Sequence, residues 1–161
     1  MALNAVVVSD STTLITLINI RKFEILFKFT DTIIITKAVY SEVSIRVDAK
    51  KILDDYVRKS KIRVEKVDDD MQVKILFTRL DLGESESIAL AIERNVPLVI
   101  DEKRGKNVAK SLGLDTIGLI GILLLYKQKK LLSPKEIKEI VVLLQESNFR
   151  VSTILLVMLL E

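Results

Sequence analysis

Short apolar runs alternate along the chain with longer segments in which apolar residues recur every three or four positions. The short runs are rich in Val and Ile, which favours buried strands, whereas the longer spacing favours amphipathic helices. We therefore expect strands at residues 5–8, 32–36, 62–67, 97–100 and 116–117. Helices are expected from about Ser11 onward, then at 22–29, 38–46, 48–59, 70–80, 82–94, 104–112, 119–129, 134–145 and 151–160.

Strands and helices alternate in this pattern, and that order favours βα units around a parallel sheet, which is an α/β fold. The run at 62–67 alternates apolar and polar positions, so it fits an edge strand or a half-exposed strand. A chain of 161 residues has room for one domain, and we expect a single domain over residues 1–161. Within it, residues 134–161 form a C-terminal helical extension.

Cysteine and histidine are both absent from the sequence. The first absence excludes disulfides, thiolate nucleophiles and Cys-ligated metals, and the second excludes the usual general base and His-ligated metals. Any metal ion must therefore be held by oxygen ligands, which selects hard cations such as Mg²⁺, Mn²⁺ or Ca²⁺. The net charge of +3 permits a nucleic-acid partner without requiring one.

Six acidic residues fall where the carboxyl ends of the expected strands should lie. In an open parallel sheet, ligands bind outside those ends. Asp10 and Asp101 each end a strand, and Glu42 lies in the helix after the second strand. The full set is Asp10, Glu42, Glu84, Glu86, Asp101 and Glu102. A βα sheet would bring these separate segments to one edge.

Each of these acids also has a purely structural interpretation. Asp10 can cap the helix that follows it, and Asp81 with Glu84 has the spacing of a capping box. The remaining acids fit turns or solvated helix faces. Glu84 shares a helix face with Ile88, so we favour it over Glu86 as the acid that points toward the sheet.

Several carboxylates at one concave edge repel each other unless a cation lies among them. Mg²⁺ suits such a site because it takes one or two carboxylates directly and keeps several waters, which further acids can hold. A cation held in this way can activate water and stabilise both the attacking and the leaving oxygen of a phosphodiester. The acid set therefore predicts a metal-dependent nuclease that needs neither His nor Cys.

Four stretches of the sequence together resemble one known family. They are VVVSDSTTLITL, TIIITKAVYSEV, LDLGESESIALAIERNVPLVIDEKRGKNVAKSLGL and TIGLIGILL. Over residues 5–132 the chain resembles PIN-domain proteins, and within them a little-characterised subgroup related to VapC-type toxins. The last segment, FRVSTILLVMLL, also resembles the final helix of that subgroup.

The resemblance implies a doubly wound, three-layer α/β/α sandwich with a central parallel sheet and an acidic pocket. PIN domains are typically Mg²⁺- or Mn²⁺-dependent ribonucleases acting on RNA. Many are toxins inhibited by a small antitoxin protein, and many form homodimers. The family's acids and nearby hydroxyl fall, in order, on Asp10, Thr12, Glu42, Glu84, and Asp101 or its neighbour Glu102. Because every acid is present, nothing in the sequence indicates an inactive copy.

Two charge features late in the chain each have two interpretations. Lys103, Arg104 and Lys106 follow the strand that ends at Asp101, so they either hold RNA phosphates or form a solvated helix face. Residues 151–160 carry no charge, where relatives usually carry more. That helix either packs on the core or lies at a subunit interface, and both can hold together.

Two further functions compete with the nuclease. VVVSDSTT resembles the start of a haloacid-dehalogenase-type phosphatase, but Thr12 stands where that family has a second Asp. A PIN-like module that binds partners without catalysis is the other alternative.

No segment reaches the roughly 20 apolar residues of a membrane span. The first residues lack the basic start of a signal peptide, so we expect a cytoplasmic protein without membrane contact.

Overall fold

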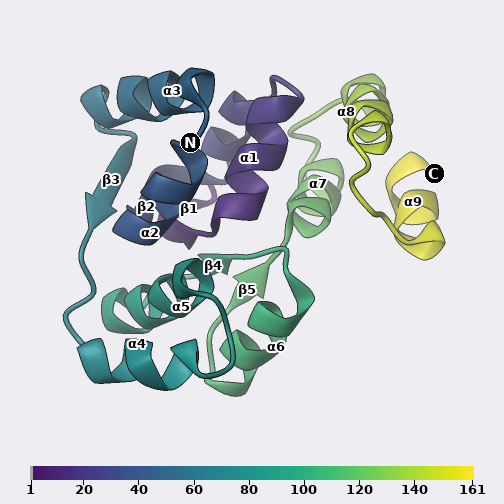
Figure 1. The fold of residues 1–161 in the computed structure, drawn as a ribbon. Coiled ribbons are helices and arrows are strands. Elements are labelled where there is room, and N and C mark those ends of the chain that lie inside the picture. Colours follow the sequence, from purple (N-terminus) through teal and green to yellow (C-terminus); the bar gives the residue numbers. More distant parts are fainter. Residues whose placement is uncertain (1) are drawn as a thin grey trace.

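The computed structural model describes residues 2–161 and centres on one five-stranded sheet (Figure 1). The strands lie in the order β3-β2-β1-β4-β5, and every neighbouring pair is parallel. Their bounds are Asn4–Ser9 for β1, Thr30–Thr36 for β2, Ile62–Glu65 for β3, Leu98–Val99 for β4 and Thr116–Ile117 for β5. This order places β1 in the middle and β3 at one edge, as the alternating pattern of residues 62–67 predicted.

Helices cover both faces of the sheet, so the predicted three-layer α/β/α sandwich is confirmed. One face is covered by α1 (Ser11–Asn19), the 3₁₀ helix η1 (Phe23–Lys28), α2 (Lys37–Val43), α3 (Val47–Arg58) and α7 (Leu119–Gln128). The next helix, α8 (Pro134–Glu146), joins the same core by packing against α7. The other face is covered by α4 (Asp70–Phe77), α5 (Leu82–Arg94) and α6 (Lys103–Ser111). The last helix, α9 (Thr153–Leu160), packs against α7 and α8.

Adjacent residues of each strand point to opposite faces, so each strand contributes to two cores. Val7 joins the larger core beneath α1 and α7, whereas Val8 joins the smaller core beneath α5. In β2, Ile33 and Ile35 lie in the larger core and Ile34 in the smaller one. The continuous apolar runs of the sequence follow from this arrangement, because a parallel sheet is buried on both sides.

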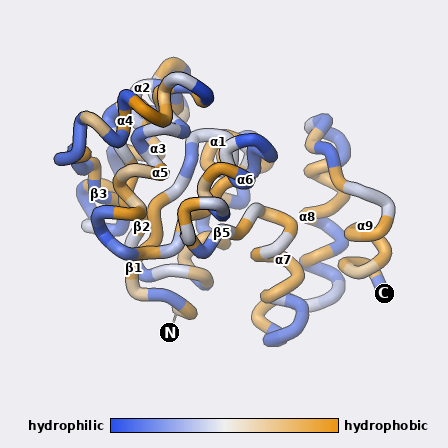
Figure 2. Tube along the Cα trace, turned by 90° about the horizontal axis from the view of Figure 1, so that it is seen from below, coloured by the Kyte–Doolittle hydropathy of each residue, from blue (hydrophilic) through white to orange (hydrophobic). Residues whose placement is uncertain are grey.

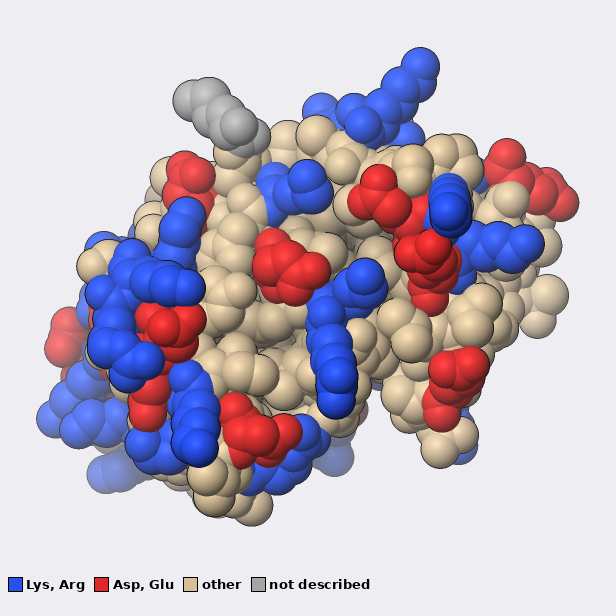
Figure 3. All heavy atoms as spheres, turned by 90° about the horizontal axis from the view of Figure 1, so that it is seen from above, with Lys and Arg blue, Asp and Glu red and all other residues tan. Residues whose placement is uncertain are grey.

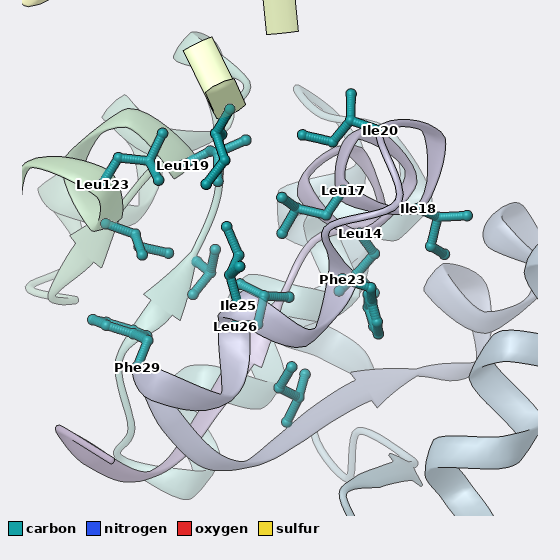
Figure 4. Close-up of a cluster of buried hydrophobic side chains, with 14 of the residues drawn as sticks. Leu14, Leu17, Ile18, Ile20, Phe23, Ile25, Leu26, Phe29, Leu119 and Leu123 are labelled. Carbon is teal, nitrogen blue, oxygen red and sulfur yellow. The ribbon is translucent and has the colours of Figure 1, made fainter. Parts of the chain in front are cut away.

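Figure 4 shows part of the larger core, where two helices contribute leucines. Leu14 and Leu17 come from α1, and Leu119 and Leu123 come from α7. All four side chains are fully buried. Burying one Leu side chain contributes roughly 1.5–3 kcal/mol. This packing anchors α1 on the sheet and thereby fixes the position of Asp10, which immediately precedes the helix.

Most expected elements are present within a residue or two of their expected bounds, and the differences have local causes. The helix expected at 38–46 ends at Val43, because the backbone of Arg46 is extended and begins α3 instead. The strand expected at 62–67 stops at Glu65, because its partner in β2 ends at Thr36. The helix expected at 22–29 is a 3₁₀ helix, a form common in short connections.

The helices α7, α8 and α9 form a group at one side of the molecule (Figures 1 and 2). Leu159 of α9 is buried in the larger core, but Ile154 is 74% exposed and Val157 and Met158 are also exposed. The helix therefore packs on the domain through one face and keeps a second apolar face at the surface. Neither α9 nor any other helix in residues 2–161 has the length and apolar character needed to cross a bilayer.

Charged side chains of both signs mix on the face seen in Figure 3, most densely over the end where Figure 1 places α3. Many of them pair with each other. Lys50 Nζ lies 2.8 Å from an Asp54 oxygen, and Lys59 Nζ lies 2.9 Å from an Asp55 oxygen. Such exposed pairs stabilise a protein little. They do, however, keep the electrostatic potential over this surface from being uniformly positive. The α3 surface is therefore poorly suited to binding a polyanion.

Candidate active site

Asp10 lies directly after β1, at the carboxyl edge of the central strand, and is only 4% exposed. Its Oδ1 accepts the backbone N–H of Thr13 at 3.0 Å, which caps α1. Its Oδ2 accepts the backbone N–H of Asp101 at 2.9 Å. The structural interpretation of Asp10 as an N-cap is therefore correct, and the second carboxylate oxygen also ties the end of β1 to the segment after β4.

Asp101 comes two residues after the end of β4, and its carboxylate is held by α1 and α7. Oδ2 accepts the Thr13 hydroxyl at 2.5 Å, and Oδ1 accepts the backbone N–H of Leu119 at 2.9 Å. Thr13 is fully buried and donates its N–H to Asp10 and its hydroxyl to Asp101. One threonine therefore holds both aspartates in place.

Glu42, in the last turn of α2, joins the same edge through Ser11. The Ser11 hydroxyl donates to Glu42 Oε2 at 2.6 Å, and Ser11 directly follows Asp10 in the chain. Gly83 of α5 lies against the other oxygen of this carboxylate, because a Cβ at Gly83 would collide with Glu42 Oε1. The lack of a side chain at Gly83 leaves the space that the Glu42 carboxylate occupies.

Glu84 and Glu102 form a second acidic group beside α6. Asp81 and Glu84 make the predicted capping box of α5. Glu102 caps α6 by accepting the backbone N–H groups of Arg104 at 3.1 Å and Gly105 at 2.6 Å. A Cβ on Gly105 would lie 2.6 Å from Glu84 Oε2 and 3.3 Å from Glu102 Oε2, so both carboxylates face the same small space.

Burial raises the pKa of two of these acids. The pKa of Glu84 rises from 4.5 to about 8, first because the side chain loses solvent and then because it contacts Glu102 and Asp81. The neighbouring Glu84 in turn lowers the pKa of Glu102, and the backbone N–H groups that Glu102 accepts lower it further. Burial also raises the pKa of Asp10 from 3.8 to about 6, against the effect of its backbone hydrogen bonds. Clustered carboxyls with raised pKa values are typical of functional sites.

The donor set at this edge suits a hard divalent cation, because every candidate ligand is a carboxylate. Glu84 Oε2 is buried, and no hydrogen-bond donor within residues 2–161 reaches it. A proton or a cation would satisfy this atom. As the side chains stand, no three acids in the described part of the chain lie close enough to hold one ion. The acids instead form two groups, one around Asp10 and Asp101 and one around Glu84 and Glu102.

The structure places the alternatives that the sequence left open in different surroundings. Asp101 joins the first group, whereas Glu102 caps α6 and turns to Glu84. Glu86 lies apart, because its Oε1 accepts the backbone N–H of Ala38 at the start of α2, at 3.2 Å. Of the two glutamates in α5, Glu84 is thus the one beside another acid of the candidate set.

The hydroxyl that contacts the aspartates is not the one expected. Thr12 is exposed, and Thr13 is the residue that bonds both Asp10 and Asp101. The sequence pattern also did not identify Ser11. Helix geometry offers a signal for Thr13, because the third residue after an N-cap returns to the side of the cap. For Ser11 the only signal is its position next to Asp10.

The three basic residues that follow Asp101 differ in their surroundings. Lys103 and Arg104 are exposed at the start of α6. Lys106 is half-buried, and its Nζ lies beside Gly118: a Cβ there would be 2.9 Å from Lys106 Nζ and 2.6 Å from Asp101 Oδ1. Of the three basic side chains, Lys106 is therefore the one that lies next to Gly118 together with the candidate catalytic acid Asp101.

Known proteins resemble this chain at the level of a family and of a solved structure. The family described as DUF3368, a PIN domain, matches residues 6–161. No curated protein matches the chain. Among solved structures, a PilT N-terminus domain protein from the hyperthermophilic archaeon Sulfolobus solfataricus P2 is similar, with 21% sequence identity and a TM-score of 0.45. That match covers 73% of this chain and 89% of the other.

Proposed function

The chain belongs to the PIN-domain family, whose members are generally nucleases, and on that premise we propose that it is a Mg²⁺- or Mn²⁺-dependent endoribonuclease. Its reaction is the hydrolysis of RNA phosphodiester bonds. The observation that supports this most strongly is the pair of Asp10 and Asp101, two carboxylates held together at the carboxyl edge of the sheet. Membership of this family also sets aside the haloacid-dehalogenase alternative.

Asp10, Glu42, Glu84 and Asp101 would hold the cation, with Glu102 as a further acid beside Glu84. When bound, the cation would lower the pKa of a water ligand and neutralise charge on the phosphodiester. Sharing one ion between the two acidic groups requires side-chain rotation, which Glu42 and Glu84 can provide because each has two flexible methylene groups.

The chain's own residues fix the orientation of the two aspartates. Thr13 and the backbone N–H of Leu119 hold the Asp101 carboxylate, while two backbone N–H groups hold Asp10. Ligands that are oriented in advance need little reorganisation when an ion and a substrate bind. Because the chain contains no His, the carboxyls of the site are the candidates for proton transfer with water. Glu84, with a pKa of about 8, retains a proton at neutral pH in the metal-free protein.

A cleavage assay tests the proposal. Single-stranded and structured RNAs are incubated with the purified chain in Mn²⁺, in Mg²⁺ and in EDTA, with DNA of the same sequence as a control. We expect RNA fragments with either cation and none in EDTA. Intact RNA under every condition would contradict catalysis and favour the alternative of a binding module. A small phosphate ester in the same assay separates nuclease from phosphatase activity.

A toxin under the control of a small antitoxin is the finer form of this proposal, as in many PIN domains. It predicts a short upstream reading frame that encodes a DNA-binding protein. Expression of this chain alone should then arrest growth, and co-expression of that partner should restore it. Growth arrest that the partner does not relieve would contradict a toxin–antitoxin pair.

The proposal also includes a homodimer or a higher homo-oligomer, supported by the apolar surface of α9. Ile154, Val157, Met158 and Leu160 are exposed along this helix. An apolar surface of this kind on a monomer favours association.

A further inference from the structure

A groove of about 400 Å³ adjoins the candidate active site at Asp101. Its lining comes from α6, β5, α7, the segment that joins α8 to α9, and Leu155 in the first turn of α9. The volume lies in the range of roughly 300–1,000 Å³ that is typical of ligand sites. The groove is therefore large enough for a substrate group next to the reacting bond.

Gly118 keeps the end of the groove near the acids open. It precedes α7, and a Cβ there would crowd both Asp101 Oδ1 and Lys106 Nζ. Without that side chain, the carboxylate and the ammonium group both line the groove. A phosphodiester that contacts Lys106 would thus lie beside Asp101.

Three cationic side chains line the groove, namely those of Lys106, Lys110 and Arg150, against the single carboxylate of Asp101. Lys106 and Lys110 are four residues apart in α6, which places them on one helix face. None of the three forms a salt bridge within residues 2–161. Their charges are therefore available to a polyanion, in contrast to the paired charges of α3.

Phe149 supplies an aromatic group to the same groove. The side chain is half-buried and packs in part against the larger core, and its backbone N–H donates to the Leu144 carbonyl at 3.0 Å. A fixed aromatic ring beside unpaired cations is the combination that binds single-stranded nucleic acids, because bases stack on the ring while the cations hold phosphates.

We propose that this groove is the subsite for the RNA nucleotide adjacent to the scissile phosphate. Phe149 stacks on its base, and Lys106, Lys110 and Arg150 contact its phosphates. The inference rests on the proposed ribonuclease function and adds the part of the protein that binds the strand. An acidic peptide would use the cations but not the aromatic ring, which makes the two occupants distinguishable.

Binding is measured in EDTA by the fluorescence anisotropy of a labelled single-stranded RNA of about ten nucleotides, a length suited to such grooves. A gel run afterwards confirms that the probe is intact. The variants are Phe149→Leu, Phe149→Tyr, Lys110→Gln and Arg150→Gln. Lys138→Gln, an exposed change on α8 outside the groove, is the matched control.

We expect Phe149→Leu to weaken binding roughly tenfold, because it removes the ring on which a base would stack. Phe149→Tyr should bind like the wild type. Lys110→Gln and Arg150→Gln should each reduce the slope of log K against log salt by about 0.7. Lys138→Gln should change neither quantity. If Phe149→Leu does not fold, the salt slopes of the two charge variants and the comparison with a poly-glutamate peptide still decide the matter.

Equal affinity in wild type and in all groove variants would overturn the proposal, even if the protein cleaves RNA. Affinity for a poly-glutamate peptide that matches the affinity for RNA, without dependence on Phe149, would also overturn it. Groove-dependent RNA binding without cleavage in Mn²⁺ would leave the subsite in place and contradict the ribonuclease function instead.

Discussion

The carboxylate of Asp10 accepts the backbone N–H of Asp101 at 2.9 Å, although the two residues are 91 positions apart in the chain. The bond joins the segments that follow β1 and β4, which are neighbours in the sheet. Thr13 reinforces it by bonding both carboxylates. The distance between the two aspartates is therefore set by the fold itself, before any ion or substrate is present.

Asp10→Asn should reduce RNA cleavage at least about 100-fold, because it removes a charged ligand from the proposed metal site. The fold should persist, since Asn is also a good N-cap. The melting temperature should fall by a few degrees, because the amide nitrogen of Asn would face the Asp101 N–H. Asp31→Asn, at an exposed position of β2, is the control. Cleavage at the wild-type rate by Asp10→Asn would remove this residue from the site.

Thr13→Val tests whether this threonine positions Asp101. The change preserves size but removes the 2.5 Å hydrogen bond to a carboxylate, so it should lower the free energy of unfolding by about 1–3 kcal/mol. Cleavage should fall roughly 10–100-fold, and Thr13→Ser should restore most of it. Thr12→Val should have the smaller effect on cleavage. The opposite ranking of the two valine variants would favour Thr12 as the site hydroxyl.

Gly83→Ala should separate stability from activity. A Cβ at this position would push the Glu42 carboxylate away from Ser11, a movement that its flexible side chain permits. The free energy of unfolding should rise by up to about 1 kcal/mol, because Ala favours the helix more than Gly does. Cleavage should fall roughly tenfold. A variant that is more stable and fully active would show that Glu42 is not part of the site.

Glu84 should make stability depend on pH. Below its ordinary pKa of 4.5 it is protonated in both the folded and the unfolded states. Between there and its folded pKa of about 8, only the folded state keeps the proton, so the free energy of unfolding falls as pH rises. In Glu84→Gln, the free energy of unfolding should not show the fall that Glu84 causes over this pH range. Melting curves of both proteins from about pH 4 to 9 measure the difference.

Manganese provides the complementary measurement. The cation binds the ionised carboxyls, so it should stabilise the wild type more at high pH than at low pH and flatten the same decline. Identical pH profiles in the wild type and Glu84→Gln, with and without Mn²⁺, would argue against both the raised pKa and the metal site.

Ile154→Lys should convert a homodimer to a monomer, because it places a charge in the exposed apolar face of α9. Light scattering coupled to gel filtration measures the mass. Met71→Lys, at an exposed apolar position of α4, is the matched control and should leave the mass unchanged. A wild-type protein that is monomeric at tens of micromolar would contradict the dimer.

The sheet and the two aspartates could be predicted because both depend on chain order. Alternating short apolar runs and helical segments permit a parallel sheet, and residues that end its strands must lie at one edge. Asp10 and Asp101 end such strands, so their proximity follows from topology. The segment after Val43 was harder, because Arg46 fits the helical spacing but bonds Asp48 and begins a new helix.

Side-chain direction could not be read from the same pattern. Asp101 and Glu102 are adjacent in the chain, yet one carboxylate is held by α1 and α7 and the other caps α6. The raised pKa of Glu84 depends on the approach of α6 at Gly105, a contact between distant segments. Such details depend on how helices settle on the sheet, which periodicity along one segment does not encode.

The use of site acids as helix caps has a practical consequence for genetics. Asp10 caps α1, Glu102 caps α6, and Glu84 completes the capping box of α5. A substitution at any of these residues can therefore lower the abundance of the folded protein as well as its catalytic activity. Glu42 lies in the last turn of α2, where its carboxylate accepts the hydroxyl of Ser11. On the proposed function, Glu42→Gln should therefore be the inactive allele whose phenotype in cells is least confused with loss of the protein.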